Sequence, residues 1–314
     1  MVEFRKLIGF GKSSLVVSLP KSWLDYNKLK KGHTVYLQEA DDQLVVSSRE
    51  NKQERVLKTI QINTENKSLD QISSEIIAAY LRNYDIWELR GKNLATEGPK
   101  VKEVLQNLSG MELMEQDSHK IVAKDLLDMS ELSIQALIRR IDLILRSMLQ
   151  DASACVHEDY YESIFHRDVD VNRLVFLLKR VINMALDNNQ IAKKLERTPR
   201  QLVIDMQMAY ILEGLGDEIK RISRFMKTIE PKHKSFKRFV EVNAELHKKY
   251  LEAMKAYHMN NALLAFSVEE GHKSRMEAID EISKLTTSHT AHRCVYHMKN
   301  LNSMVKNIAR TVLS

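Results

Sequence analysis

The sequence predicts a multidomain α+β protein with a β-rich head over residues 1–49, a small α+β domain over 50–126 and an all-helical body over 127–314. Short β-branched runs between turn residues fill the first region, and the second mixes strand and helix patterns. Apolar residues recur at helical spacing throughout the third. Glycine and proline number only 9 and 4 in 314 residues, which favours a mostly helical body.

The head is predicted to form two pairs of strands around one helical turn. The strands are expected at 3–8, 14–19, 33–38 and 43–48, with the turn at Pro20–Tyr26. So short a set of strands cannot bury a sufficient core by itself. We therefore expect two chains to interleave their heads in a homodimer.

The stretch GFGKSS at residues 9–14 contains the residue types of a phosphate-binding loop. A P-loop needs a further glycine where this chain has Lys6, and it must open a helix. Here LVVSLP follows and predicts a strand. We expect no bound nucleotide.

Positive charge is concentrated at the start of the chain. Residues 1–31 hold seven Lys and Arg against two acidic residues, so five of the six net positive charges of the protein lie there. A compact basic end on a near-neutral body is typical of a nucleic-acid-binding head. A merely solvated charged surface would give the same composition.

The second region predicts a βαβαββ order, with helices on one face of a small open sheet. Strands are expected at 55–62, 85–90, 111–116 and 120–125. Ser68 and Gln71 form a capping box for the first helix, and the second is expected at 99–108. No catalytic cluster occurs in this region, which we interpret as a linker or dimerisation domain.

The third region predicts six long helices in two antiparallel halves of three. Thr198, Pro199 and Gln201 together mark one helix start. The last three helices are expected at 239–257, 260–285 and 288–312.

Two polar pairs stand four residues apart in this body: Asp168 with Asn172, and Glu213 with Asp217. Each pair projects from one helix face. If the two helices are neighbours, the four side chains can converge on a hard or borderline cation. Acids at this spacing are also common on solvated helix faces.

The segments HRDVDVNRLVFLLKR (166–180) and YILEGLGDEIKRIS (210–223), with the closing NIA at 307–309, resemble the PhoU family. The resemblance implies tandem three-helix bundles that bind metal clusters, typically iron or zinc, here on the first bundle. The ligands it implies are Asp168, Asn172, Glu213 and Asp217. Asn172 replaces an aspartate of the family pattern. Lys299 and Ser303 stand at the equivalent positions of the second half, so we expect that site to be lost.

The head has its own resemblance. GKSSLVVSLPKSWL, followed by LKKGHTVYL, is similar to the SpoVT/AbrB-type swapped-hairpin domain, with His33 where an aspartate is common. The resemblance implies that two interlaced chains bind duplex DNA. The expected contacts are Arg5, Lys6, Lys12, Ser13, Ser14 and Lys21.

These observations predict a dimeric DNA-binding transcriptional regulator, linked to phosphate uptake or signalling, whose helical body senses a signal. The alternative is an interaction protein that restrains a phosphate transporter or its sensor kinase and uses the head only for assembly. An enzyme is not expected, because no nucleophile, base and orienting residue occur together. The sequence shows no membrane span or signal peptide, and its two cysteines lie far apart. We therefore expect no membrane insertion and a cytoplasmic location.

Overall fold

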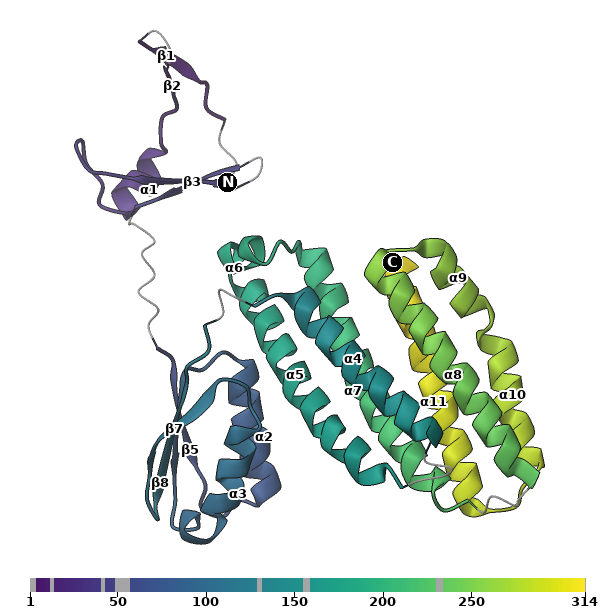
Figure 1. Cartoon of the computed structure of the whole chain (residues 1–314). Coiled ribbons are helices and arrows are strands. Elements are labelled where there is room, and N and C mark those ends of the chain that lie inside the picture. The colour runs from purple at the N-terminus through teal and green to yellow at the C-terminus, as the bar shows by residue number, and fades with distance from the viewer. Residues whose placement is uncertain are drawn as a thin grey trace. The chain divides into compact units, whose positions relative to one another are not determined.

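The computed structural model describes residues 4–11, 14–40, 43–48, 57–128, 132–154, 159–229 and 234–313. The chain divides into two compact units, Met1–Val56 and Leu57–Ser314. Figure 1 labels helices and strands of both units.

The first unit contains two antiparallel hairpins and a short helix, as the sequence predicts. The first strand lies later than expected, because Gly11 adopts the left-handed φ of +70° and takes the turn. Gly9 therefore stays in the strand and pairs with Leu15. The elements are β1 (Ile8–Phe10), β2 (Ser14–Val16), α1 (Lys21–Tyr26), β3 (Tyr36–Ala40) and β4 (Gln43–Ser47).

None of the described side chains of this first unit is buried. Large apolar side chains are instead open to solvent, among them Phe4 at 91%, Phe10 at 71% and Leu37 at 62%. Isolated hydrophobic residues are normal on a protein surface, but a whole unit without a core is not. The interleaving of two heads stays a prediction. It would give each head the buried core that the single unit lacks.

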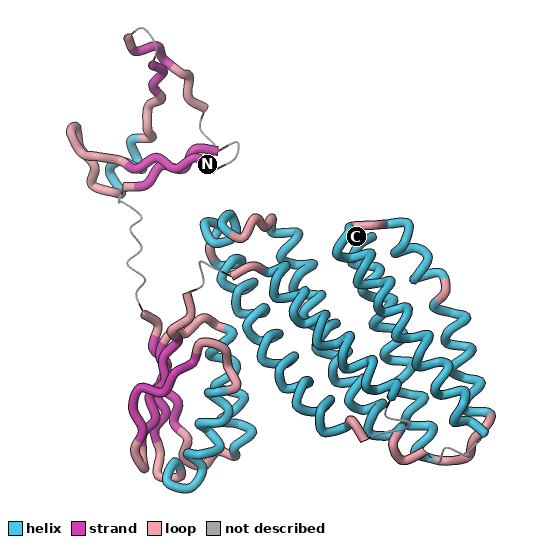
Figure 2. The backbone as a smooth tube through the Cα atoms, in the orientation of Figure 1, coloured by secondary structure: helices cyan, strands magenta, loops and turns pink. Residues whose placement is uncertain are grey.

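The second unit begins with a four-stranded sheet in the order β5-β6-β8-β7. β5 and β6 are parallel, and β8 pairs antiparallel with both β6 and β7. Two helices cover one face, which confirms the predicted βαβαββ order (Figure 2). The elements are β5 (Thr59–Asn63), α2 (Leu69–Leu81), β6 (Ile86–Arg90), α3 (Leu94–Gln106), β7 (Met111–Gln116) and β8 (Lys120–Asp125).

Local sequence signals set the helix ends in this domain, with one exception. The capping box of Ser68 and Gln71 is present at the start of α2. α3 begins at Leu94 rather than at Pro99. Proline costs the helix one backbone hydrogen bond there. Burial of Leu94, Val101 and Leu105 on one face of α3 outweighs that loss.

The helical body follows the predicted pattern of two halves. The first half consists of α4, α5 and α7, with α6 as a short connector, and the second of α8, α9, α10 and α11. α7 packs against both α5 and α11 and so joins the halves. The elements are α4 (Ile134–Ala154), α5 (Tyr161–Asp187), α6 (Asn189–Lys194), α7 (Pro199–Met226), α8 (Lys234–Met259), α9 (Ala262–Glu270), α10 (His272–Lys284) and α11 (His289–Leu313).

The helix predicted at 260–285 is divided into α9 and α10 at Gly271. A Cβ at this position would lie 2.5 Å from Nη1 of Arg275. The buried guanidinium of Arg275 donates a hydrogen bond of 2.7 Å to the carbonyl of Val268, in the last turn of α9. The break therefore accommodates a buried arginine that the apolar periodicity does not reveal.

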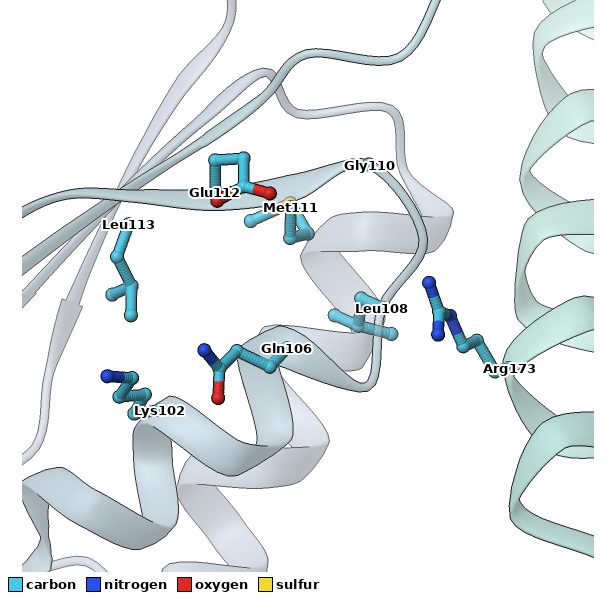
Figure 3. Close-up of a pocket in the computed structure, with 8 residues that line it drawn as sticks. All are labelled: Lys102, Gln106, Leu108, Gly110, Met111, Glu112, Leu113 and Arg173. Carbon is cyan, nitrogen blue, oxygen red and sulfur yellow. The ribbon is translucent and has the colours of Figure 1, made fainter.

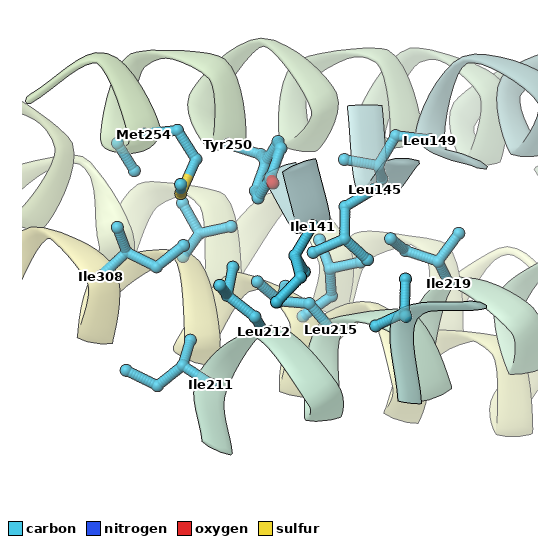
Figure 4. Packing of buried hydrophobic residues seen from close by; sticks show 14 of the residues in the cluster. Ile141, Leu145, Leu149, Ile211, Leu212, Leu215, Ile219, Tyr250, Met254 and Ile308 are labelled. Carbon is cyan, nitrogen blue, oxygen red and sulfur yellow. The ribbon is translucent and has the colours of Figure 1, made fainter. Parts of the chain in front are cut away.

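One hydrophobic core runs through both halves of the body. Figure 4 shows side chains of α4, α7, α8 and α11 meeting in it. Ile141 and Leu145 lie with Leu212 and Leu215, and Tyr250 of α8 lies close by. The halves are therefore packed together as one body. None of the helices in the described part of the chain is long and apolar enough to cross a membrane.

Candidate functional site

The acidic motif of the first half lies between α5 and α7. Asp168 of α5 is 2% exposed and lies against Gly216 of α7. A Cβ at position 216 would stand 3.0 Å from Oδ1 of Asp168. Glycine is thus the residue that allows the two helices to approach here. The structure brings Asp168 next to the helix turn that carries Asp217, as the sequence predicts for neighbouring helices.

Lys220 lies between these two carboxylates. Its Nζ binds Oδ2 of Asp168 and, at 2.9 Å, Oδ1 of Asp217. Burial raises the pKa of Asp168, and the neighbouring ammonium opposes that shift without cancelling it. Burial by itself lowers the pKa of Lys220, but its hydrogen bonds to Asp168 and Asp217 outweigh burial and raise it. Lys220 is therefore held in its charged form.

Glu213 is bound by a different lysine. Its Oε2 lies 2.5 Å from Nζ of Lys179, which comes from α5 and is itself 6% exposed. The same ammonium lies 3.8 Å from the centre of the Tyr210 ring, a cation–π contact. Asn172 is half-buried on α5.

The four residues predicted as metal ligands thus lie on facing helices, but lysines contact three of them. Among the residues that the structure describes, no group of three or more His, Cys, Asp or Glu side chains is placed to hold a metal ion. The donor set of Asp168, Asn172, Glu213 and Asp217 does not fit a metal cluster while Lys179 and Lys220 occupy its oxygens.

In the second half, Lys299 and Ser303 stand at the positions equivalent to the acidic motif. Lys299 pairs with Asp280, and Ser303 donates to the carbonyl of Lys299. Nε of the buried Arg275 donates to Oδ1 of Asn302 at 2.8 Å. The expected loss of a metal site there stays a prediction.

Two buried aspartates that the sequence analysis missed join the halves. Asp142 of α4 accepts hydrogen bonds from Arg146, from Tyr250 Oη at 2.8 Å, and lies 3.0 Å from His258 Nε2. Asp205 of α7 is bound by Arg197, and Tyr257 Oη lies 3.3 Å from it. An acid in the phase of a buried apolar stripe is the signal that could have revealed both.

Arg180 was also missed, in the apolar run VFLLKRV. It is fully buried and pairs with Asp125 of the sheet domain at 2.7 Å. Asn183 of the same helix donates to the carbonyl of Leu81 at 2.9 Å. These contacts attach α5 to the sheet domain.

A polar hollow of about 470 Å³ lies between the sheet domain and α5. Figure 3 shows Lys102 and Gln106 of α3 across from Glu112 of β7, and Arg173 of α5 beside Leu108. Nε of Arg173 lies 3.3 Å from Oγ of Ser109. The volume is in the range of small-molecule sites. A second hollow, of about 330 Å³, is lined by His289, His292, Arg293, Tyr296 and His297 of α11.

The predicted DNA contacts of the head are described in part. Arg5, Lys6, Ser14 and Lys21 are exposed, and Ser14 opens β2. Lys12 and Ser13 lie outside the described residues. A strand follows the GFGKSS stretch, where a P-loop would open a helix.

No protein-family model and no curated protein matches the sequence. Among solved structures, the chain is similar to a crystal structure of PhoU from Pseudomonas aeruginosa, with a TM-score of 0.50 and 15% sequence identity. The match covers 57% of this chain, about the extent of α4 to α11, and 93% of the PhoU chain. The helical body of this protein therefore has a PhoU-like fold.

Proposed function

We propose that this protein is a dimeric DNA-binding transcriptional regulator connected with phosphate uptake or signalling, which acts by binding and not by catalysis. The observation that carries the proposal is the head: exposed basic residues on a unit whose described side chains include none that is buried. Such a regulator would be located in the cytoplasm and would bind duplex DNA there.

The exposed apolar side chains of the head support the proposed dimerisation. Burying one large apolar side chain stabilises an association by roughly 1.5–3 kcal/mol. The strands of the head expose many, including Ile8, Phe10, Leu15, Leu37 and Leu44. A second copy of the same unit offers the matching surface, and interleaving the two would give each the core that it lacks.

The positive charge of the head supports the proposed DNA binding. Phosphate neutralisation by Lys and Arg supplies most of the sequence-independent affinity for a duplex. Arg5, Lys6 and Lys21 are exposed on the head, and a dimer would present each of them twice. The hydroxyl of Ser14 can donate to a phosphate or a base edge.

The PhoU-like body supports a sensing or interaction role, with phosphate transporter or sensor kinase components as partners. A partner that binds one arrangement of the body better would bias how the two heads are spaced on DNA. The same likeness favours the second candidate, an interaction protein that restrains such a transporter or kinase and uses the head only for assembly.

Fluorescence anisotropy with a labelled random duplex distinguishes these two functions. We expect binding that weakens steeply between 50 and 200 mM salt, with a slope of about −0.9 per neutralised phosphate. Lys21→Ala should reduce that slope. Lys255→Ala, which removes an exposed lysine of α8, is the matched control and should leave it unchanged. A dimer that binds no DNA at 50 mM salt would refute the regulator and support the interaction protein.

A further inference from the structure

We infer that the ammonium group of Lys220 takes the place of a metal ion at the acidic motif of the first half-bundle and keeps closed a latent divalent-cation site formed by Asp168 and Asp217. The inference uses only the fold and contacts of the helical body. It does not depend on whether the head binds DNA.

Asp168 is the buried end of this site. The residue is 2% exposed, and its Oδ1 would lie 3.0 Å from a Cβ on Gly216, a position that Val171 and Leu145 also adjoin. Oδ2 contacts Lys220, whereas Oδ1 is buried and accepts no hydrogen bond from the described residues. A buried carboxylate oxygen without a donor is costly, so this group depends on the cation beside it.

Lys220 supplies that cation and also binds Asp217 at the mouth of the site. Its side chain is 21% exposed, which places the ammonium between a buried and a half-exposed carboxylate. Arg221 adds a second contact to Asp217 at 3.0 Å. Glu213, the remaining acid of the motif, is bound by Lys179. Internal cations thus contact each of the three predicted acidic ligands.

A divalent ion cannot share this position with Lys220. It would have to bind the same oxygens, and two positive charges within hydrogen-bonding distance repel each other strongly at a partly buried site. The ammonium is tethered to α7 and present in every folded chain, so it competes at a high effective concentration. We therefore expect the wild-type motif to bind no divalent cation at ordinary concentrations.

Removal of Lys220 would take away the ammonium group that competes with a divalent ion for these oxygens. Asp168 would then lose the cation that contacts it, and Asp217 would keep only its contact with Arg221. Carboxylate oxygens are the ligands that Mn²⁺ prefers, and Zn²⁺ accepts them as well. The vacated site would offer both carboxylates and the unpartnered Oδ1, with water completing the coordination.

The test is a Mn²⁺ titration of the full chain followed by electron paramagnetic resonance. For Lys220→Ala we expect one additional Mn²⁺ per chain, bound at least tenfold more tightly than any site of the wild type. Lys220→Ala combined with Asp168→Asn should lose that site. Lys299→Ala is the matched control, because it frees the exposed Asp280 in the other half and should gain nothing comparable.

Two results would overturn the inference. One is a wild-type Mn²⁺ or Zn²⁺ site that disappears in Asp168→Asn, since the motif would then hold metal in the presence of Lys220. The other is a folded Lys220→Ala protein without the additional site. Asp168→Asn leaves the histidines of α11 unchanged. A Zn²⁺ site that disappears in this variant is therefore not formed by those histidines.

Lys220→Gln guards against a failure to fold, since it keeps the length of the side chain while removing its charge. It should gain a weaker Mn²⁺ site, and Mn²⁺ should raise its melting temperature but not that of the wild type. If Lys220→Ala does not fold, a Lys220→Gln protein that gains neither Mn²⁺ affinity nor thermal stabilisation overturns the inference in its place.

Discussion

Arg180 of α5 and Asp125 at the end of β8 form an ion pair from which water is excluded, with side chains 0% and 1% exposed and Nη2 2.7 Å from Oδ2. The guanidinium also donates to the carbonyl of Tyr84 at 2.9 Å and lies 4.3 Å from the centre of the Tyr80 ring. Arg180, a side chain of the helical body, thus makes its polar and aromatic contacts inside the sheet domain. The predicted linker is therefore fixed to α5 within the same compact unit.

Arg180→Met should lower the free energy of unfolding by about 3–5 kcal/mol, because it leaves the carboxylate of Asp125 buried without its partner. The double variant with Asp125→Leu should recover much of this loss. Urea unfolding followed by the fluorescence of Trp87, which is buried near Arg180, measures both. Arg310→Ala breaks an exposed pair with Glu269 and should cost at most about 1 kcal/mol. A loss below 1 kcal/mol for Arg180→Met would contradict this role.

Asp142→Asn should destabilise the protein at neutral pH by about 1–3 kcal/mol, since hydrogen bonds to a charged group are lost. Burial raises the pKa of Asp142, but hydrogen bonds from His258, Arg146 and Tyr250 outweigh burial and leave the pKa below its usual value. The stabilisation is therefore complete above the unfolded pKa of about 3.9 and is lost as the pH falls through the folded pKa.

Urea unfolding of the wild type and Asp142→Asn at pH 7, 5, 4 and 3.5 measures this dependence. The difference between the two should stay constant down to about pH 4 and shrink below it. Asp280→Asn, which changes a half-exposed carboxylate, serves as the control. A difference that does not change with pH would show that the charge of Asp142 is not responsible.

Gly214 and Gly216, two residues apart on α7, should respond to alanine in opposite directions. A Cβ at 214 meets only the flexible end of Met304, so Gly214→Ala should gain about 0.5–1 kcal/mol from helix propensity. A Cβ at 216 meets Asp168 and Val171, which are held in the core. Gly216→Ala should therefore lose that gain and destabilise by about 1 kcal/mol. Thermal unfolding of both variants decides the point, and equal stabilisation would argue against close approach at Gly216.

The apolar surface of the head should control oligomeric state. We expect the full chain to sediment as a dimer and residues 57–314, which form a compact unit of their own, as a monomer. Leu37→Ser should weaken the dimer at least tenfold, because the side chain is lost from both copies. Leu263→Ser removes a leucine of α9 that is even more exposed, at 83% against 62% for Leu37, and is the control. A monomeric full chain, or a dimer unaffected by Leu37→Ser, would count against the interleaved head.

Local patterns of the sequence determined most of the secondary structure. The capping boxes at Ser68 and Thr198, the hairpin at 111–125 and the long apolar stripes all act over a few residues. They fixed the order of elements and the two-half helical body before any packing was considered. The likeness of that body to PhoU could also be predicted, because the motifs that carry it are short stretches of the sequence. The exact ends of α3 and the break at Gly271 could not, because buried contacts outweigh local propensity there.

Only the tertiary structure decided which partners the charged residues contact. The spacing of Asp168, Glu213 and Asp217 predicted a shared face, and the fold brings them to the α5–α7 interface. Spacing along α7 allows Lys220 to contact Asp217, three residues before it, but it carries no information on whether a cation reaches an acid of another helix. Lys179 and Lys220 reach these carboxylates, and Arg180 reaches Asp125, because packing places long basic side chains beside acids that are buried or half-buried, where a contacting cation offsets the cost of burial.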